Sequence, residues 1–396
     1  MVPRVLQAKL RSLARKYPIV TVTGPRQSGK TTLCRATFPR KRWVSFENPD
    51  VRAYAAQDPR GFLAEHRTGA IFDEVQRAPE ILSYLQTEVD ERPVAGRFVL
   101  TGSANLMLLQ AVTQSLAGRT GLLQLLPLSL DEVRRFPDPP EDLFEVLWRG
   151  GYPAPFDRGL SPTDWFPSYV ATYVERDVRR VLNVGDLQVF QTFLRLCAGR
   201  TGQLVNLSSL GADCGINHGT ARAWLSVLEA TYIVFRLPAF HASSSKRLVK
   251  TPKLHFYDAG LACHLLGIRT PRHLRDHPLR GAIFESWVVS EIAKARIHRG
   301  LPAGLYHYRD RKGAEVDAVL ERDGGLVAVE IKSARTVASD FLAALEAFAS
   351  TFAAPGRHGR VEQVLVYGGE DAQQRTRARV LPWSQLHRHD WVGGRP

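Results

Sequence analysis

Short apolar runs alternate with helical spacing through the first 150 residues of the chain. A helical pattern begins at Thr31, and the apolar runs lie at Pro18–Thr23, Trp43–Phe46, Ala70–Phe72 and Arg97–Leu100. Buried strands that alternate with helices predict an α/β fold with a parallel sheet. Prolines and glycines at 137–140 and 150–153 interrupt both patterns, so we expect the first domain to span residues 1–150.

The remainder of the chain divides into a helical segment and a segment that returns to strands. Helical spacing dominates from Trp165 to Glu229, and apolar strand patterns resume between Leu305 and Val366. We therefore expect a helical domain at 151–270 and an α/β domain at 271–385. Residues 386–396, which end in glycines and a proline, are expected to form a tail.

A helix-turn-helix pattern lies inside the helical segment. Leu207–Leu210 begins one helix, Gly215 suits the turn, and Asn217 opens a second helix. Apolar residues repeat along the second helix at three- and four-residue spacing: Ala221, Trp224, Leu225 and Leu228. Polar residues on its other face and a basic run after it would contact DNA: His218, Thr220, Arg222, Lys246, Arg247, Lys250 and Lys253. The alternative is an interdomain lid that uses the same fold for packing.

Composition and charge narrow the classes of partner. Lysine and arginine total 53 against 39 acidic residues, and the net charge of +14 favours a polyanionic partner, although an arginine-rich proteome would give the same balance. No apolar run approaches the roughly 20 residues of a membrane span, so we expect no membrane association. Four scattered cysteines and an N-terminus without a long apolar region indicate a cytoplasmic protein with reduced thiols.

The segment Gly24–Thr31 fits the phosphate-loop pattern G-x-x-x-x-G-K-[ST] between a predicted strand and a predicted helix. Its backbone N–H groups and the helix N-terminus would surround phosphate oxygens. Lys30 would reach the β- and γ-phosphates and Thr31 would ligate magnesium. The sequence therefore predicts ATP and Mg²⁺ as cofactors, bound by Gly24, Pro25, Arg26, Gln27, Ser28, Gly29, Lys30, Thr31 and Thr32.

Two acids end the apolar strand at Ala70–Phe72. Ligands of parallel sheets bind at the carboxyl ends of the strands, so Asp73 would take part in holding magnesium and Glu74 would deprotonate the attacking water. Ser103 ends the next strand, where either a γ-phosphate sensor or an ordinary turn serine would lie. Arg119 either reaches a neighbouring subunit as an arginine finger or is a solvated surface residue.

The last domain holds a second set of acids. Glu285 lies in a helical stretch, Asp317 in one strand, and Glu330 with Lys332 on one face of another strand. Together they resemble the PD-(D/E)xK nuclease site, in which carboxylates hold magnesium and the lysine orients water. Val316 replaces the usual proline. The alternative is a salt-bridged cluster in a domain that does not cleave.

Residues 18–150 resemble an AAA-type P-loop ATPase, in particular the prokaryotic group whose loop reads Gly-Pro-Arg-Gln-x-Gly-Lys-Thr-Thr. Further matches lie at Phe72–Gln76, Leu100–Ser103, Ser115–Arg119, Gly150–Pro153, Tyr173–Asp177 and Phe256–Gly260. The resemblance implies a winged-helix-like middle region, a nuclease-like C-terminal domain and a homo-oligomer such as a ring.

Three functions remain open at this point. In the first, the nucleotide state controls a DNA-directed C-terminal region. In the second, the chain is a nucleotide switch that recognises protein and uses the helical and nuclease-like domains as scaffolds. In the third, the nuclease-like domain is the effector and ATP licenses it.

Overall fold

The computed structural model describes residues 2–103, 115–174, 186–240, 250–310, 313–322, 324–353 and 360–393, without the side chains of Ser103, Tyr173 and Val174. The chain forms two compact units. The first unit comprises Met1–Leu128 with two short returning segments, Ala230–Tyr232 and Ile297–Leu301. The second unit comprises Ser129–Glu229, Ile233–Arg296 and Pro302–Pro396.

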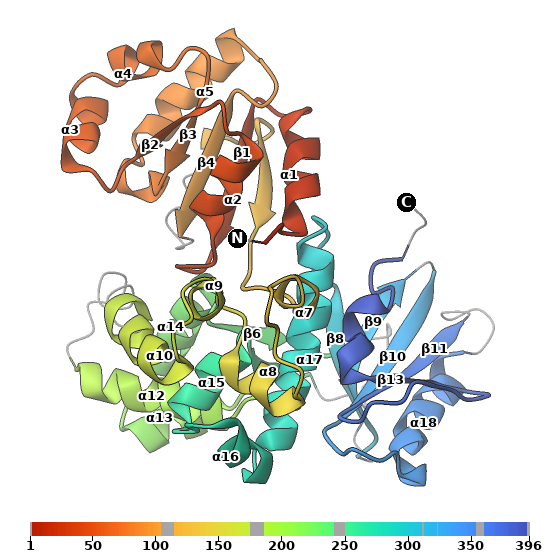
Figure 1. Ribbon diagram of the computed structural model, residues 1–396. Helices are drawn as coiled ribbons and strands as arrows, with labels where there is room; N and C mark the ends of the chain where they lie inside the picture. Colours follow the sequence, from red (N-terminus) through yellow and green to blue (C-terminus); the bar gives the residue numbers. More distant parts are fainter. Residues whose placement is uncertain are drawn as a thin grey trace. The chain divides into compact units, whose positions relative to one another are not determined.

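A five-stranded sheet in the order β2-β3-β4-β1-β5 forms the centre of the first unit, and each neighbouring pair is parallel. The strands are β1 (Ile19–Gly24), β2 (Arg42–Ser45), β3 (Ala70–Asp73), β4 (Phe98–Ser103) and β5 (Thr120–Gln124). Figure 1 shows β1 between its neighbours, with α2 following it. The prediction of a parallel α/β sheet is confirmed.

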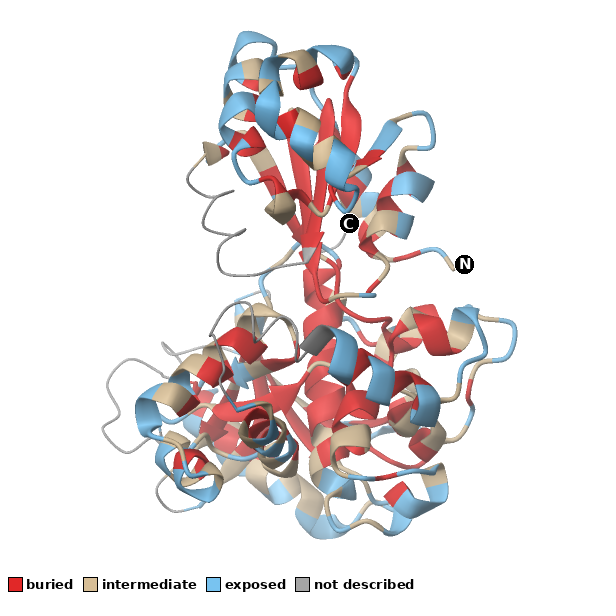
Figure 2. Cartoon of the chain, turned by 90° about the vertical axis from the view of Figure 1, so that its left-hand side faces the viewer, coloured by how far each residue is buried: buried red, intermediate tan, exposed pale blue. Residues whose placement is uncertain are grey.

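Helices connect these strands along the chain, because both faces of a parallel sheet are apolar and must be covered. The helices of the first unit are α1 (Leu6–Ala14), α2 (Lys30–Thr37), α3 (Pro49–Gln57), α4 (Pro59–Glu65), the 3₁₀ turn η1 (Val75–Arg77) and α5 (Ile81–Glu91). Every residue of β1 and β3 is buried, and Figure 2 shows buried strands with exposed positions on the surrounding helices. The buried strands hold the loops at their carboxyl ends in place.

The second unit begins with helices. They are α7 (Leu130–Val133), α8 (Leu143–Arg149), α9 (Pro153–Asp157), α10 (Pro162–Tyr169), the π-helical turn η2 (Val170–Val174), α12 (Leu187–Gly199), α13 (Leu207–Cys214), α14 (His218–Ala230), α15 (Ala259–Leu265), α16 (Pro271–Asp276) and α17 (Arg280–Ile297). Gly215 joins α13 to α14 in the left-handed conformation, with φ of 68°. Two antiparallel strands, β6 (Val234–Leu237) and β7 (Lys253–Phe256), follow α14.

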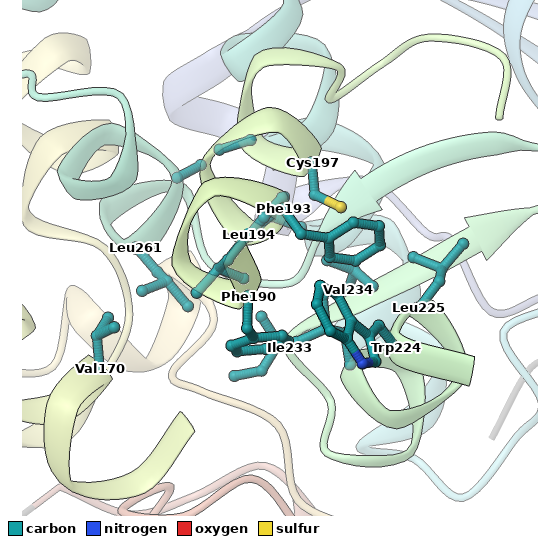
Figure 3. Packing of buried hydrophobic residues seen from close by; sticks show 14 of the residues in the cluster. Val170, Phe190, Phe193, Leu194, Cys197, Trp224, Leu225, Ile233, Val234 and Leu261 are labelled. Atoms are coloured by element: carbon teal, nitrogen blue, oxygen red, sulfur yellow. The ribbon is translucent and has the colours of Figure 1, made fainter. Parts of the chain in front are cut away.

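An aromatic core fixes α12 against α14. Phe190 and Phe193 each meet Trp224 edge to face, with ring centroids 5.4 Å apart. Figure 3 shows these three side chains within the packed core. The predicted apolar face of α14 is buried, so that part of the helical pattern is confirmed.

A six-stranded mixed sheet in the order β12-β13-β11-β10-β9-β8 completes the second unit. Its strands are β8 (Leu305–Arg309), β9 (Glu315–Arg322), β10 (Gly325–Lys332), β11 (Val361–Tyr367), β12 (Gln373–Gln374) and β13 (Arg379–Pro382). The short helices η3 (Ser339–Leu342), α18 (Ala343–Phe352) and η4 (Trp383–Arg388) accompany the sheet. Among the residues described, no helix has the length and hydropathy needed to cross a membrane.

Candidate functional site

The loop between β1 and α2 contains positive φ angles and a close backbone contact that favour glycine. Gly24 has φ of 151°, and a Cβ at this position would lie 2.1 Å from the carbonyl oxygen of Leu125. Gln27 and Gly29 also have positive φ, at 57° and 93°. Such left-handed positions turn successive backbone N–H groups inward, which is the arrangement that binds anions.

Lys30 and its neighbours lie around this loop. The buried Lys30 ammonium donates to the carbonyls of Gly24 and Pro25, at 3.0 and 2.7 Å, and so uses two of its three hydrogens. Burial lowers the pKa of Lys30 to about 8, against the opposing effect of Glu74. Arg26 is half-buried beside the loop, whereas Thr32 is exposed in the first turn of α2.

The predicted magnesium ligands are neighbours. The Thr31 hydroxyl donates to Asp73 Oδ1 at 2.7 Å, and Asp73 is buried. Mg²⁺ binds hard oxygen ligands from the protein together with nucleotide phosphates and water. The adjacent hydroxyl of Thr31 and carboxylate of Asp73 are ligands of this kind. These residues fit the ion.

Thr101 is a member of this site that sequence reasoning missed. Its buried hydroxyl also donates to Asp73 Oδ1, from β4, which runs parallel to β3. The Leu100–Ser103 segment drew attention to Ser103 instead. The alternation of side chains in adjacent parallel strands is the signal that could have found Thr101.

Thr101→Val is expected to raise the Mg²⁺ concentration for half-maximal ATP turnover by about tenfold or more, because hydrogen bonds to metal ligands hold them in position. Thr101→Ser, which keeps the hydroxyl, should behave as wild type. The measurement is ATPase activity against Mg²⁺ at fixed ATP. Equal Mg²⁺ requirements in the valine and serine variants would contradict this positioning role.

Glu74 follows β3 in a left-handed backbone conformation, with φ of 56° and ψ of 45°. A residue with a Cβ pays about 1–2 kcal/mol for this conformation, and such strain concentrates at functional sites. The Gln76 side-chain amide donates to the Glu74 carboxylate. The half-buried Glu74 is therefore held beside Asp73 by both its backbone and Gln76.

Arg4 braces the loop from outside the motif. Its guanidinium donates to the carbonyl oxygens of Ser28 and Leu126, both at 2.7 Å, and the residue is buried. Arg4 therefore joins the loop between β1 and α2 to the turn after β5. No local pattern indicated this residue, because both of its partners lie far along the chain.

Ser103 and Arg119 are the two remaining residues of the predicted nucleotide site. The Ser103 side chain lies outside the described residues. Arg119 makes a two-pronged ion pair with Asp90 of α5, at 2.6 and 2.7 Å, and donates to the carbonyl of Ala117 at 3.0 Å. The guanidinium is therefore held at the surface of its own unit.

The predicted acid and lysine set gathers at one end of the mixed sheet. Ala318 pairs with Val329 in the antiparallel register of β9 and β10, which brings Asp317 next to Glu330. Asp317 accepts a hydrogen bond from the Ile331 N–H at 2.8 Å, and Glu330 accepts one from Lys332. Burial raises the pKa values of Glu285, Asp317 and Glu330.

Lys253 contradicts its predicted role as an exposed wing residue that meets phosphates. Its side chain is only 4% exposed, and its ammonium contacts the carboxylates of Glu285, Glu315 and Asp317 at 2.8, 2.5 and 3.7 Å. The prediction is wrong because β7 directs this lysine inward. Within the described ranges, no group of three or more His, Cys, Asp or Glu side chains is arranged to hold a metal ion.

Three sequence families match successive parts of the chain. An AAA domain matches residues 16–134. Two domains of unknown function, DUF8612 and DUF4143, match residues 140–272 and 280–386. The AAA match contains the loop between β1 and α2, Asp73 and Glu74.

Among solved structures, the Walker-type ATPase of Pyrococcus abyssi is 16% identical with a TM-score of 0.46, covering 66% of this chain and 94% of that one. AMPPCP-bound DnaA from Aquifex aeolicus is 13% identical with a TM-score of 0.30, covering 57% and 86%.

Two mycobacterial relatives match most of the chain. They are the uncharacterized proteins Rv2008c of Mycobacterium tuberculosis and Mb2031c of Mycobacterium bovis. Each is 31% identical over 334 residues, which cover 83% of this chain and 73% of the relative. The chain therefore belongs to the same family as these mycobacterial proteins, and its first unit carries an AAA domain of the P-loop ATPase type.

Proposed function

We propose that this protein hydrolyses ATP with magnesium and uses the nucleotide state to control its second unit. The observation that carries the proposal is the contact of Thr31 with Asp73 directly beside the Lys30 loop. One site then offers Lys30 for the phosphates, Thr31 and Asp73 for the metal ion, and Glu74 for the attacking water. Glu74, fixed next to Asp73, supplies the base.

The chain's own groups divide the work of hydrolysis. Inward N–H groups of the loop and the Lys30 ammonium bind the phosphates, and Thr31 and Asp73 hold magnesium. Magnesium, when bound with the nucleotide, neutralises charge that develops on the phosphate oxygens. Glu74 orients a water molecule and takes its proton. The deciding test is ATP turnover in magnesium, with and without single- and double-stranded DNA, followed by inspection of the DNA for cuts.

DNA is the partner we propose for the second unit, through two basic surfaces. The α13–Gly215–α14 arrangement with β6 and β7 supports a winged-helix interpretation, with His218, Arg222 and Lys250 exposed. A cavity of about 560 Å³ at the far end of the mixed sheet supplies the second surface. Five arginines line it: Arg322, Arg360, Arg375, Arg377 and Arg379. Lys246 and Arg247 lie outside the described residues.

Binding to duplex DNA is expected to weaken steeply as salt rises, because each phosphate contact releases about one counterion. Lys250→Ala should lower the slope of log K against log salt by about one if the winged-helix surface binds. Fluorescence anisotropy with labelled DNA at several salt concentrations measures this slope.

Arg360→Ala is the matched variant for this measurement, since Arg360 is exposed and lines the cavity. A change of slope in only one variant identifies the surface that binds. Absence of DNA or RNA binding even at low salt would reject the DNA-directed function.

The second candidate function is a nucleotide switch that recognises protein and uses a non-cleaving nuclease-like domain as a scaffold. The burial of Lys253 among carboxylates favours it, because a basic residue assigned to DNA is used inside the fold. ATP turnover that DNA does not stimulate would support this candidate.

A further inference from the structure

A largely buried cluster of four acids and two lysines joins four elements of the second unit. Glu315 and Asp317 lie on β9, Glu330 and Lys332 on β10, Glu285 on α17, and Lys253 on β7. Lys332 contacts Glu330, whose other oxygen, Oε2, is buried and has no hydrogen-bond partner among the described residues. Glu315 Oε2 also lies 3.6 Å from Arg309 Nη1, whose side chain is 43% exposed. The cation that meets all three of the other acids is a second lysine.

Lys253 is that cation. Its Nζ lies 2.8 Å from Glu285 Oε1, 2.5 Å from Glu315 Oε1 and 3.7 Å from Asp317 Oδ1. An ammonium has three hydrogens, so it can meet three such oxygens. Three carboxylates from two elements thus converge on one nitrogen.

The backbone fixes Lys253 in this position. Lys253 pairs with Leu237 of β6 on one side and forms a β-bridge with Leu204 on the other. Its side chain is 4% exposed, whereas Lys250, three residues earlier, is exposed. The ammonium is therefore a built part of the cluster rather than the end of a solvent-exposed side chain.

A divalent cation needs the same oxygens. Mg²⁺ binds oxygen ligands at about 2.0–2.1 Å and requires them to converge on one point. In this cluster the point between Glu285, Glu315 and Asp317 holds an ammonium nitrogen, and a second cation beside it would meet strong repulsion at low effective dielectric. Removing the ammonium would instead leave Glu285 and Asp317 without the cation that contacts them.

We propose that Lys253 is the internal counter-ion of this carboxylate cluster and excludes divalent cations from it, so that the domain does not cleave phosphodiesters. The proposal is independent of ATP hydrolysis in the first unit. It also assigns Lys253 a role that differs from that of Lys332, because Lys332 pairs with Glu330 on its own strand.

The test is Mn²⁺ binding to the full chain, measured by the electron paramagnetic resonance signal of free Mn²⁺. All proteins carry Asp73→Asn and no nucleotide, so that the ATPase site does not contribute. Without other changes the chain should bind no Mn²⁺ that depends on Asp317. Lys253→Met, which keeps the volume and removes the charge, should bind one Mn²⁺ at least about tenfold more tightly. Lys16→Met, the same change at an exposed lysine outside the proposed DNA surfaces, should leave Mn²⁺ binding unchanged.

Two results obtained with Lys253 intact would overturn the proposal. One is a Mn²⁺ site in the protein with Lys253 intact that disappears in Asp317→Asn. The other is Mg²⁺- or Mn²⁺-dependent DNA cleavage by wild type that Asp317→Asn abolishes. Both measurements use proteins that retain Lys253, so they decide the question even if Lys253→Met fails to fold. A folded Lys253→Met variant, checked by circular dichroism, that gains no Mn²⁺ site would also contradict the proposal.

Discussion

Glu74→Gln is expected to bind ATP with unchanged affinity and to turn it over about 10³-fold more slowly, because a positioned general base contributes about 10²–10⁴ to rate. Lys30→Ala should instead weaken ATP binding by about 10²-fold, since it removes a buried charge-assisted contact to phosphate. The two variants therefore separate binding from chemistry. Fluorescent-nucleotide titration gives the affinity and phosphate release gives the turnover.

Glu80→Gln is the matched control for the base, because Glu80 is an exposed acid in the same stretch of chain. It should retain wild-type affinity and turnover. A wild-type rate in Glu74→Gln would show that another group deprotonates water. Loss of ATP binding in Glu74→Gln would show that the Glu74 carboxylate supports the loop instead.

The geometry of the candidate nucleotide site was predictable where residues close together in the sequence determine it. Gly24 and Gly29 set the turns of the loop, and β1 and α2 follow from the apolar patterns on either side. Asp73 and Glu74 end a buried strand, and the carboxyl ends of parallel strands meet at one edge of a sheet. The same local logic predicted the parallel sheet.

Arg4 and Thr101 were not predictable in this way, because each acts through a partner brought near by tertiary structure. Arg4 reaches carbonyls 24 and 122 residues away, and Thr101 reaches Asp73 across adjacent strands. Local patterns contain no information about either contact. A lone arginine before the motif and a threonine inside a strand are each ordinary on their own.

Lys253 was predicted wrongly for a related reason. It follows Lys246, Arg247 and Lys250 in the sequence, and a basic run of this kind normally lies in solvent. Its burial depends on acids that lie 32 or more residues later, of which Glu285 is the nearest in sequence. The charge pattern therefore indicated that Lys253 pairs with anionic groups, but these groups are carboxylates of the same chain rather than phosphates.

Arg119→Ala is expected to lower ATP turnover by about 10³-fold with little change in nucleotide affinity, if Arg119 acts in a neighbour's site. Its position excludes a role in its own site. Thr120 pairs with Ile19 at the start of β1, whereas the loop between β1 and α2 begins at Gly24, about 17 Å away at roughly 3.3 Å per residue. Asp90→Asn is the control, because it breaks the same ion pair but keeps the arginine.

Mixing two inactive variants tests the neighbour's role directly. In an oligomer made from Glu74→Gln and Arg119→Ala chains, a site with an intact Glu74 can receive Arg119 from an adjacent Glu74→Gln chain. Recovery of turnover on mixing would therefore require that Arg119 acts between subunits, since neither variant supplies both groups within one chain. If Asp90→Asn and Arg119→Ala both retain wild-type turnover, the ion pair is a surface contact only. A monomer in light scattering with ATP present and turnover intact would remove the arginine-finger assignment as well.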